Sequence, residues 1–188
     1  MEVFETKQPL TVRINELKDK SLNIGLVPTM GALHQGHLSL ISSAFEENDY
    51  VVVSIFVNPT QFNNAEDLEK YPRTLERDLA LLEDFSDRII VFAPSADDIY
   101  DSNIQSENQK FDGVENEMEG ANRPGHFDGV GTIVGKLFEI VQPNRAYFGE
   151  KDFQQLQIIR KMVEKKKFDL TIIGCPVYRE ENGLAMSS

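Results

Sequence analysis

Two histidines lie three residues apart in a glycine-rich turn of this chain. Gly31 precedes His34, and Gln35 and Gly36 separate His34 from His37. Side chains three positions apart at the start of a helix can point to the same side, and glycines let backbone come close to a ligand. A helix N-terminus favours anions because its free N–H groups point outward. The spacing therefore indicates a phosphate-binding site at the start of a helix.

The histidine pair could also be a chance pair of surface residues or part of a metal site. The chain has three histidines, and two of them share this turn, which disfavours chance. A zinc site would need His126 as a third ligand, and no fourth ligand is obvious. Phosphate binding is therefore favoured over a metal.

Uncharged amides form a second group of candidates. Gln61 and Gln155 can each donate to a carboxylate and accept from a hydroxyl, which suits a hydroxy acid. A buried site of this kind rejects analogues that lack the hydroxyl. The alternative is a capping or surface role, which fits Gln154 better than Gln155. Asn58 either fixes the loop after a strand or contacts the substrate.

Charged side chains in the remaining loops give further candidates. Lys151 precedes a predicted helix and could reach bound phosphates, although by itself it reads as an ordinary surface lysine. Asp78 could lie near Mg²⁺, or could be an acid that favours a helix N-terminus. Arg123 and His126 either anchor a loop over the site or have a structural role.

Composition limits the class of protein. The 188 residues carry 31 acidic and 19 basic side chains, a formal net charge of -12. That charge repels nucleic acid and anionic lipid, so neither is expected as a main partner. The one cysteine, Cys175, excludes an internal disulfide and a cysteine-based zinc site. Without a signal stretch or a long apolar run, a cytoplasmic protein is expected.

Apolar periodicity predicts alternating strands and helices. We expect strands at residues 22–27, 50–57, 88–92, 146–148 and 170–173, and helices at 36–47, 74–85, 130–141 and 152–167. The first strand should end at Pro28. This order is typical of a Rossmann-like, doubly wound parallel sheet with helices on both faces, in one domain over residues 1–188. Ligands should bind at the carboxyl ends of the strands.

The acidic stretch 95–122 breaks this alternation. We expect it to be solvated, with one short strand near Phe111. The lysines near the end of the last predicted helix are expected to complement the helix dipole and face solvent; they are Lys161, Lys165, Lys166 and Lys167.

The motifs resemble a known family. The segment from His34 to His37 resembles the HIGH motif of the nucleotidylyltransferase superfamily, which includes class I aminoacyl-tRNA synthetases. Residues 25–34 form a longer motif that fewer families share, and it resembles that of the pantothenate synthetase family. Further blocks agree in order and spacing over essentially the whole chain; they lie at residues 57–62, 71–74, 123–127, 147–155 and 183–188.

The resemblance implies a HIGH-type nucleotidylyltransferase fold and a ligase that condenses pantoate with β-alanine. ATP, expected with Mg²⁺, would convert pantoate to pantoyl adenylate and pyrophosphate, and the amine would then displace AMP. A carboxylate needs no general base for the first step, so the site should supply positioning and charge stabilisation. The family also suggests a homodimer, with the strand at 51–57 as a possible contributor.

Residue roles follow from the same resemblance. The catalytic candidates are His34, His37 and Lys151. The ATP-binding candidates are Met30, Gly31, His34, Gly36, His37, Gly149, Glu150, Lys151, Asp152, Met186, Ser187 and Ser188. The pantoate and β-alanine candidates are Pro28, Thr29, Met30, Asn58, Gln61, Gln155 and His126. The last three ATP-binding candidates resemble the start of a mobile KMSKS-like loop, although alone they would be a flexible terminus.

The family continues into a smaller C-terminal domain that covers the site, and this domain is absent from the chain. We expect a truncated chain that binds ATP weakly and is strongly impaired in ligation, because an uncovered acyl adenylate meets water. Two other classes stay open. One is a plain nucleotidylyltransferase that stops at the adenylyl product, and the other is a non-catalytic dimerisation module.

Overall fold

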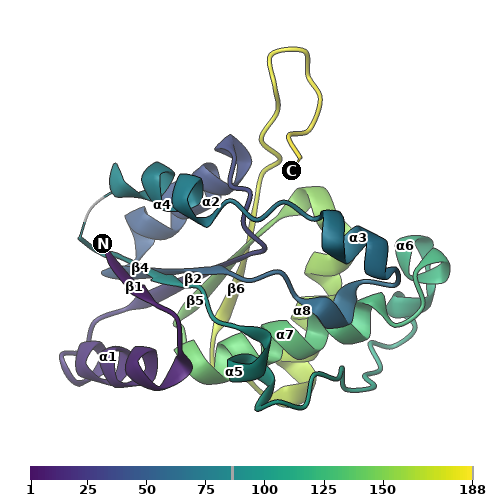
Figure 1. Cartoon of the computed structure of the whole chain (residues 1–188), viewed down its shortest axis with the longest axis horizontal. Helices are drawn as coiled ribbons and strands as arrows, with labels where there is room; N and C mark the ends of the chain where they lie inside the picture. The colour runs from purple at the N-terminus through teal and green to yellow at the C-terminus, as the bar shows by residue number, and fades with distance from the viewer. Residues whose placement is uncertain (86, 188) are drawn as a thin grey trace.

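The computed structural model describes residues 1–85 and 87–187. It contains a six-stranded sheet in the order β1-β4-β3-β2-β5-β6, and every neighbouring pair is parallel (Figure 1). The strands are β1 Glu2–Phe4, β2 Ile24–Thr29, β3 Tyr50–Ile55, β4 Ile89–Phe92, β5 Arg145–Gly149 and β6 Thr171–Cys175. From β2 the chain adds β3 and β4 on one side and later β5 and β6 on the other. The order therefore reverses between β2 and β5, where such sheets bind ligands.

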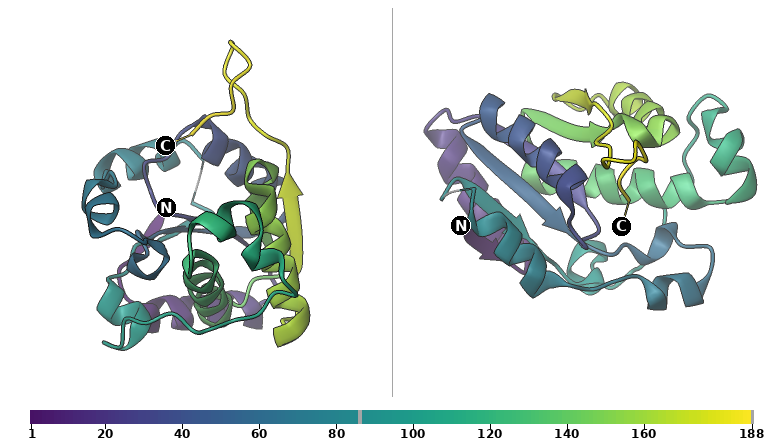
Figure 2. Two further views of the ribbon diagram at one scale, coloured as in Figure 1. Left: turned by 90° about the vertical axis from the view of Figure 1, so that its right-hand side faces the viewer. Right: turned by 90° about the horizontal axis from the view of Figure 1, so that it is seen from above.

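Helices cover both faces of the sheet, as predicted (Figures 1 and 2). The longer ones are α1 Lys7–Asp19, α2 Gln35–Glu47, α4 Leu75–Glu83, α7 His126–Val141 and α8 Phe153–Lys166. The shorter ones are α3 Ala65–Lys70, α5 Ala96–Tyr100 and α6 Met118–Asn122, with 3₁₀ turns η1 Pro59–Gln61, η2 Val114–Asn116 and η3 Glu150–Asp152. One apolar cluster joins α1, α7 and α8 to the sheet, and the second joins α2 and α4 to its other face.

β3 shows why the strands read as unbroken apolar runs. Val52 packs in one cluster and Val51 and Val53 in the other, and all three are fully buried. Successive side chains point to opposite faces, and both faces are covered. β3 lies inside the sheet between β2 and β4; the expectation that residues 51–57 contribute to a dimer contact stays a prediction.

Pro28 does not end the first predicted strand. β2 continues to Thr29, and Pro28 is paired with Ser54 of β3. β2 pairs with β5 only at Gly25 and Leu26, so Pro28 lies where β2 has lost one neighbour. A residue without an N–H is tolerated at such a place.

The other predicted elements are present with small shifts of their ends, except that α7 begins four residues earlier than expected, at His126. β1, α1, α3, α5 and α6 were not predicted. No strand lies near Phe111, so that prediction is wrong. Phe111 is 1% exposed and belongs to the main core. Its apolar side chain therefore anchors an irregular segment to the core and does not mark a strand.

The acidic segment 103–117, here called the strap, is tied to α8. Lys165 Nζ lies 2.6 Å from Asp112 Oδ1, Lys166 Nζ lies 3.0 Å from Glu107 Oε2, and Lys161 also pairs with Asp112. Lys165 and Lys166 lie in the last turn of α8 and are exposed, as predicted for lysines that complement the helix dipole; the ion pairs with the strap were not predicted. Much of the strap itself is exposed, as expected.

In the described part of the chain, none of the helices combines the length and apolar character needed to cross a membrane.

Candidate active site

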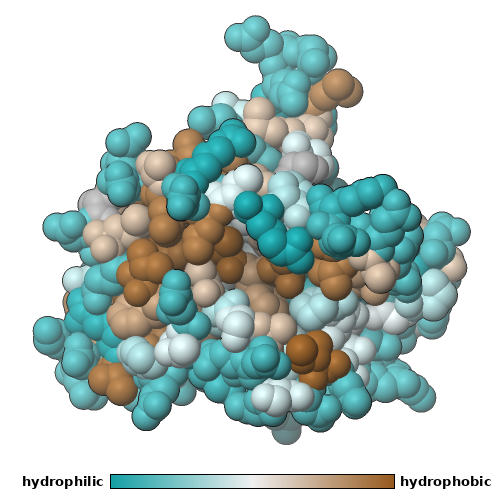
Figure 3. Space-filling view, viewed as in Figure 1, coloured by the Kyte–Doolittle hydropathy of each residue, from teal (hydrophilic) through white to brown (hydrophobic). Residues whose placement is uncertain are grey.

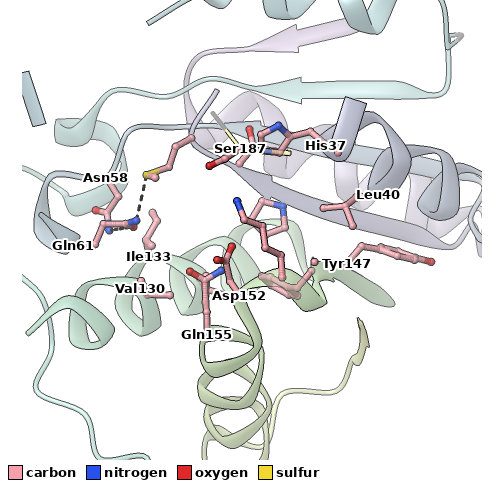
Figure 4. A pocket seen from close by; sticks show the side chains of 18 of the residues that line it. His37, Leu40, Asn58, Gln61, Val130, Ile133, Tyr147, Asp152, Gln155 and Ser187 are labelled. Atoms are coloured by element: carbon pink, nitrogen blue, oxygen red, sulfur yellow. Dashed lines mark hydrogen bonds between the residues drawn. The ribbon is translucent and has the colours of Figure 1, made fainter. Parts of the chain in front are cut away.

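A cavity of about 490 Å³ lies at the carboxyl ends of β2 and β5. This is the switch point of the sheet, and the volume suits a small-molecule ligand. Figure 4 shows His37 at one end, Asn58 and Gln61 at the other, and Asp152 and Gln155 rising from the start of α8 between them.

Most of the candidate residues line this cavity. They are Pro28, Thr29, Met30, His34, Gly36, His37, Asn58, Gln61, His126, Gly149, Lys151, Asp152, Gln155, Met186 and Ser187. Gly31, Glu150 and Asp78 are not among its lining residues. Ser188 lies outside the described residues.

The two histidines form the N-terminal cap of α2. His34 Nδ1 accepts the backbone N–H of Gly36 at 3.1 Å, and His37 Nδ1 accepts the backbone N–H of His34 at 3.3 Å. The ring centroids are 4.0 Å apart. A neutral imidazole that accepts at Nδ1 carries its proton on Nε2. The cap therefore gives both rings an Nε2–H donor.

Both rings are uncharged near neutral pH. Burial lowers the pKa of His34, with a further contribution from the nearby charge of Lys151. Burial, His34 and Lys151 together lower the pKa of His37 to about 4. These electrostatic effects arise because the Lys151 ammonium lies near both rings. The sequence expectation that this ammonium and the two imidazoles converge on one triphosphate stays a prediction.

Lys151 lies in η3, and its side chain reaches across the mouth of the cavity. Its Nζ donates to the backbone oxygen of Met186 at 3.1 Å. Figure 4 places Ser187 beside His37. The end of the chain therefore folds back from the hairpin after β6 and covers the phosphate-binding candidates.

The opposite end of the cavity holds the amide of Gln61. Asn58 Nδ2 donates to Gln61 Oε1 at 3.0 Å and to the backbone oxygen of Gly129 at 3.2 Å, while Gln61 Nε2 contacts Met30 Sδ at 3.2 Å. Gln61 therefore turns its N–H group toward the cavity. Gln155 lies on the wall formed by α8, and its amide has no hydrogen bond to another described residue.

Apolar side chains of α7 separate the two amides from the core. Val130, Ile133, Val134 and Leu137 line the cavity along one face of this helix. These residues were not among the predicted site residues. Their helical spacing was visible in the sequence but also fits ordinary core packing, so it carried no functional signal.

His126 holds the backbone next to Gln61. It is 6% exposed, and its Nδ1 lies 2.8 Å from the backbone oxygen of Gln61. Burial lowers the pKa of His126, so a neutral ring with its proton on Nδ1 can donate this bond. Arg123 forms an ion pair with Glu119, and both side chains line the cavity. A structural role in this loop therefore fits both residues.

Asp78 stabilises the turn that precedes His34 through hydrogen bonds to its backbone. It is fully buried, and its two carboxylate oxygens accept the backbone N–H groups of Ala32 at 3.0 Å and Leu33 at 2.8 Å. Gly31 and Ala32 both have positive φ angles, 81° and 50°, so this turn needs external support. These contacts favour a structural role for Asp78 over a role as a Mg²⁺ ligand. Within residues 1–85 and 87–187, no cluster of three or more potential metal-ligating side chains occurs.

Comparison with known proteins decides the family. The model of the family described as pantoate-beta-alanine ligase matches residues 2–188. The chain belongs to the pantoate–β-alanine ligase family. It is 57% identical to a pantothenate synthetase of Christiangramia forsetii over 188 residues, and 52% identical to one of Acetivibrio thermocellus. Each alignment covers 100% of this chain and 66% of the relative.

Solved structures of the pantoate–β-alanine ligase family share the fold. A pantothenate synthetase from Thermus thermophilus aligns with a TM-score of 0.89 at 46% identity, covering all of this chain and 66% of that one. A pantoate-beta-alanine ligase from Francisella tularensis, complexed with βγ ATP and β-alanine, aligns with a TM-score of 0.94 at 44% identity, covering 100% of this chain and 71% of that one. The predicted α/β nucleotidylyltransferase fold is confirmed.

Proposed function

We propose that this chain is the ATP- and pantoate-binding part of a ligase that condenses pantoate with β-alanine, forming pantothenate, AMP and pyrophosphate. The observation that carries the proposal is one cavity with two different ends. Two Nε2–H donors and the Lys151 ammonium lie at one end, and the Gln61 amide lies at the other. A triphosphate suits the first end and a hydroxy acid suits the second. The family relationship, including the Francisella tularensis complex, supports the same assignment.

The first step joins pantoate to AMP. A carboxylate oxygen of pantoate attacks the α-phosphorus of ATP, and the bond from that phosphorus to the bridging oxygen breaks. Pyrophosphate leaves with the electron pair. The carboxylate is already ionised, so the residues have no proton to remove. The Lys151 ammonium and the imidazole N–H groups of His34 and His37 stabilise the charge that develops on the phosphate oxygens.

The second step forms the amide. The neutral amine of β-alanine attacks the acyl carbon of pantoyl adenylate, the bond to the AMP oxygen breaks, and the nitrogen loses a proton. AMP leaves as a stable anion. The same donors that hold the phosphates in the first step stabilise this leaving group.

The amide end selects and orients the acid. Gln61 offers an N–H to a carboxylate or hydroxyl oxygen, and Gln155 offers an amide from the opposite wall. The apolar side chains of Val130 and Ile133 lie beside Gln61 (Figure 4) and suit the geminal methyl groups of pantoate. Alignment of the carboxylate with the α-phosphorus is the main contribution expected from these contacts.

Mg²⁺ would enter with ATP, held chiefly by phosphate oxygens. Asp78 does not fit a role as its ligand, because both carboxylate oxygens are buried against backbone N–H groups. We assign no residue of this chain to the ion.

A cytoplasmic homodimer completes the proposal. Hydrophobic residues gather in the middle of the face seen in Figure 3, with hydrophilic residues around them. An apolar surface of this kind is common at contacts between subunits. Sedimentation equilibrium of the protein would test the dimer, and a single monomeric species at micromolar concentration would contradict it.

Product analysis tests the activity. The protein is mixed with ATP and pantoate, pyrophosphate is measured, and β-alanine is then added. We expect pyrophosphate release that depends on pantoate and, after β-alanine is added, one AMP for each amide formed, at the low rate expected above for ligation by this chain. A plain nucleotidylyltransferase would release no AMP when β-alanine is added. Calorimetric titration of the chain with ATP and with pantoate separately gives the binding readout, and failure to bind either ligand would sink the proposal.

A further inference from the structure

A buried tyrosine hydroxyl lies behind the amide end of the cavity, outside the lining residues. Tyr100, the last residue of α5, is 3% exposed, and its hydroxyl donates to Asn58 Oδ1 at 2.6 Å. The hydroxyl of Thr60 lies 3.1 Å from the same oxygen and 3.0 Å from the Tyr100 hydroxyl, so its single proton can go to either oxygen. Tyr100 therefore touches the amide network without lining the cavity.

The orientation of the Asn58 amide is determined by its surroundings. Its Nδ2 faces the backbone oxygen of Gly129 at 3.2 Å, and a carbonyl oxygen can only accept. The hydroxyl proton of Tyr100 points to the amide oxygen, and the Thr60 hydroxyl lies beside both that oxygen and the Tyr100 hydroxyl. A flipped Asn58 amide would lose these contacts, and Asn58 is 1% exposed, so water could not replace them.

The orientation of the Asn58 amide also determines the orientation of the Gln61 amide. The second proton on Asn58 Nδ2 goes to Gln61 Oε1 at 3.0 Å, so the oxygen of the Gln61 amide is engaged on the protein side. Its Nε2 then faces the cavity, where Met30 Sδ, a weak acceptor, lies 3.2 Å away. A ligand oxygen would be a stronger acceptor for the same N–H.

We propose that Tyr100 is a positioning residue, which acts through Asn58 to hold the Gln61 amide as a hydrogen-bond donor to an oxygen of the acid substrate. This inference rests on the proposed function and deepens it. Burial raises the pKa of Tyr100, so the hydroxyl keeps the proton that it donates. The site then prefers an acceptor at this position, such as a carboxylate or hydroxyl oxygen, and disfavours a group that can only donate, such as an ammonium.

The test uses Tyr100→Phe, which removes one oxygen and keeps the ring. Pantoate and ATP are titrated separately into the protein by calorimetry. We expect pantoate to bind about tenfold more weakly, the effect of losing one hydrogen bond, and ATP affinity to change less than twofold. Thr60→Ala, which removes the hydroxyl beside both Tyr100 and the Asn58 oxygen, should show a smaller loss in the same direction. Tyr50→Phe, a tyrosine at the amino end of β3, is the control and should bind both ligands normally.

A double-mutant cycle separates positioning from general packing. In a Gln61→Ala background there is no amide to orient, so adding Tyr100→Phe should cause no further loss of pantoate affinity. The same loss in both backgrounds, an equal loss for ATP, or unchanged pantoate affinity in Tyr100→Phe would overturn the inference while leaving the proposed function intact. Failure of the unaltered protein to bind pantoate would overturn the proposed function itself, and this inference with it.

Discussion

The two ends of the cavity are held by different kinds of contact. The phosphate end is the one with His34, His37 and Lys151, and the acid end is the one with the Gln61 amide, called the amide end above. At the phosphate end, His34 and His37 orient each other and the first turn of α2 within four residues. At the acid end, Gln61 depends on Gly129 and His126, which are more than sixty positions away in the chain. The helix cap at the phosphate end would keep its structure with any residue that caps equally well. The acid end keeps its structure only while several distant elements pack together. The two ends should therefore respond differently to substitution.

The largest effect should come from the ammonium at the phosphate end. Lys151→Met removes the charge near both histidines, and we expect pantoate-dependent pyrophosphate formation to fall about 100- to 1000-fold, as when a preorganised donor is lost. The matched control is Lys161→Met, which removes an exposed ion pair with the strap and should retain activity within about twofold. Similar losses in both variants would remove Lys151 from the catalytic group.

Gly129→Ala should disrupt the acid end alone. A Cβ at Gly129 would lie 2.5 Å from the backbone oxygen of Thr60 and 2.6 Å from Gln61 Cα, so η1 must move. We expect a loss of about 1–3 kcal/mol in the free energy of unfolding and a larger loss of affinity for pantoate than for ATP, measured by denaturation and calorimetry. Gly135→Ala on the same helix meets Met162 Sδ at an ordinary 3.6 Å and should be neutral or stabilising. Equal losses for the two ligands in Gly129→Ala would contradict the separation of the ends.

Two substitutions of His34 distinguish its capping role from its ligand role. His34→Asn keeps a good N-cap but removes the Nε2–H donor, whereas His34→Ala removes both. We expect ATP affinity to fall about tenfold in both variants, consistent with one charge-assisted hydrogen bond. The free energy of unfolding should fall by about 1 kcal/mol only in His34→Ala. Normal ATP affinity in His34→Asn would show that His34 serves the helix and not the nucleotide.

The last prediction leaves ligand binding aside and concerns the pH dependence of stability. His37 has a folded pKa of about 4 against an ordinary value of 6.5, so the unfolded chain binds the proton more readily. The contribution of His37 to stability is therefore complete above about pH 6.5 and is lost as the pH falls toward 4. Denaturation midpoints of the protein and of His37→Gln, measured across this range, should converge as the pH falls. A constant difference between them would contradict the lowered pKa.

The turn and helix that carry His34 and His37 could be predicted because their information is local. The glycine-bracketed histidines, the following helix and the strand before it all lie within one short segment, and periodicity places them correctly. The strands of the sheet were recognisable for the same reason, since burial on both faces leaves unbroken apolar runs. β1 was missed because it has three residues, too few for any periodic signal.

The acid end and its supports could not be predicted in this way. Nothing in the sequence near Asp78 indicates that its carboxylate accepts N–H groups 45 and 46 positions earlier in the chain. The orientation of the Gln61 amide likewise depends on Asn58, Tyr100 and Gly129, which come together only through folding. The motifs identified Gln61 as a site residue, but only the contacts show that it donates.

The strap also has a consequence for the behaviour of the protein in salt. Its end farther from the cavity is held by ion pairs between side chains that are 34–59% exposed, which dissolved ions screen. Its other end is held by the buried amide of Gln154, which donates to the backbone oxygens of Val114 and Glu117 at 2.8 and 2.7 Å, and such neutral bonds are insensitive to ionic strength. Concentrated salt should therefore speed amide hydrogen exchange around Asp112, while exchange near Glu117, and at Glu107, whose N–H donates to Thr132 Oγ1 at 2.8 Å, keeps its rate, so that the two ends of one segment loosen independently.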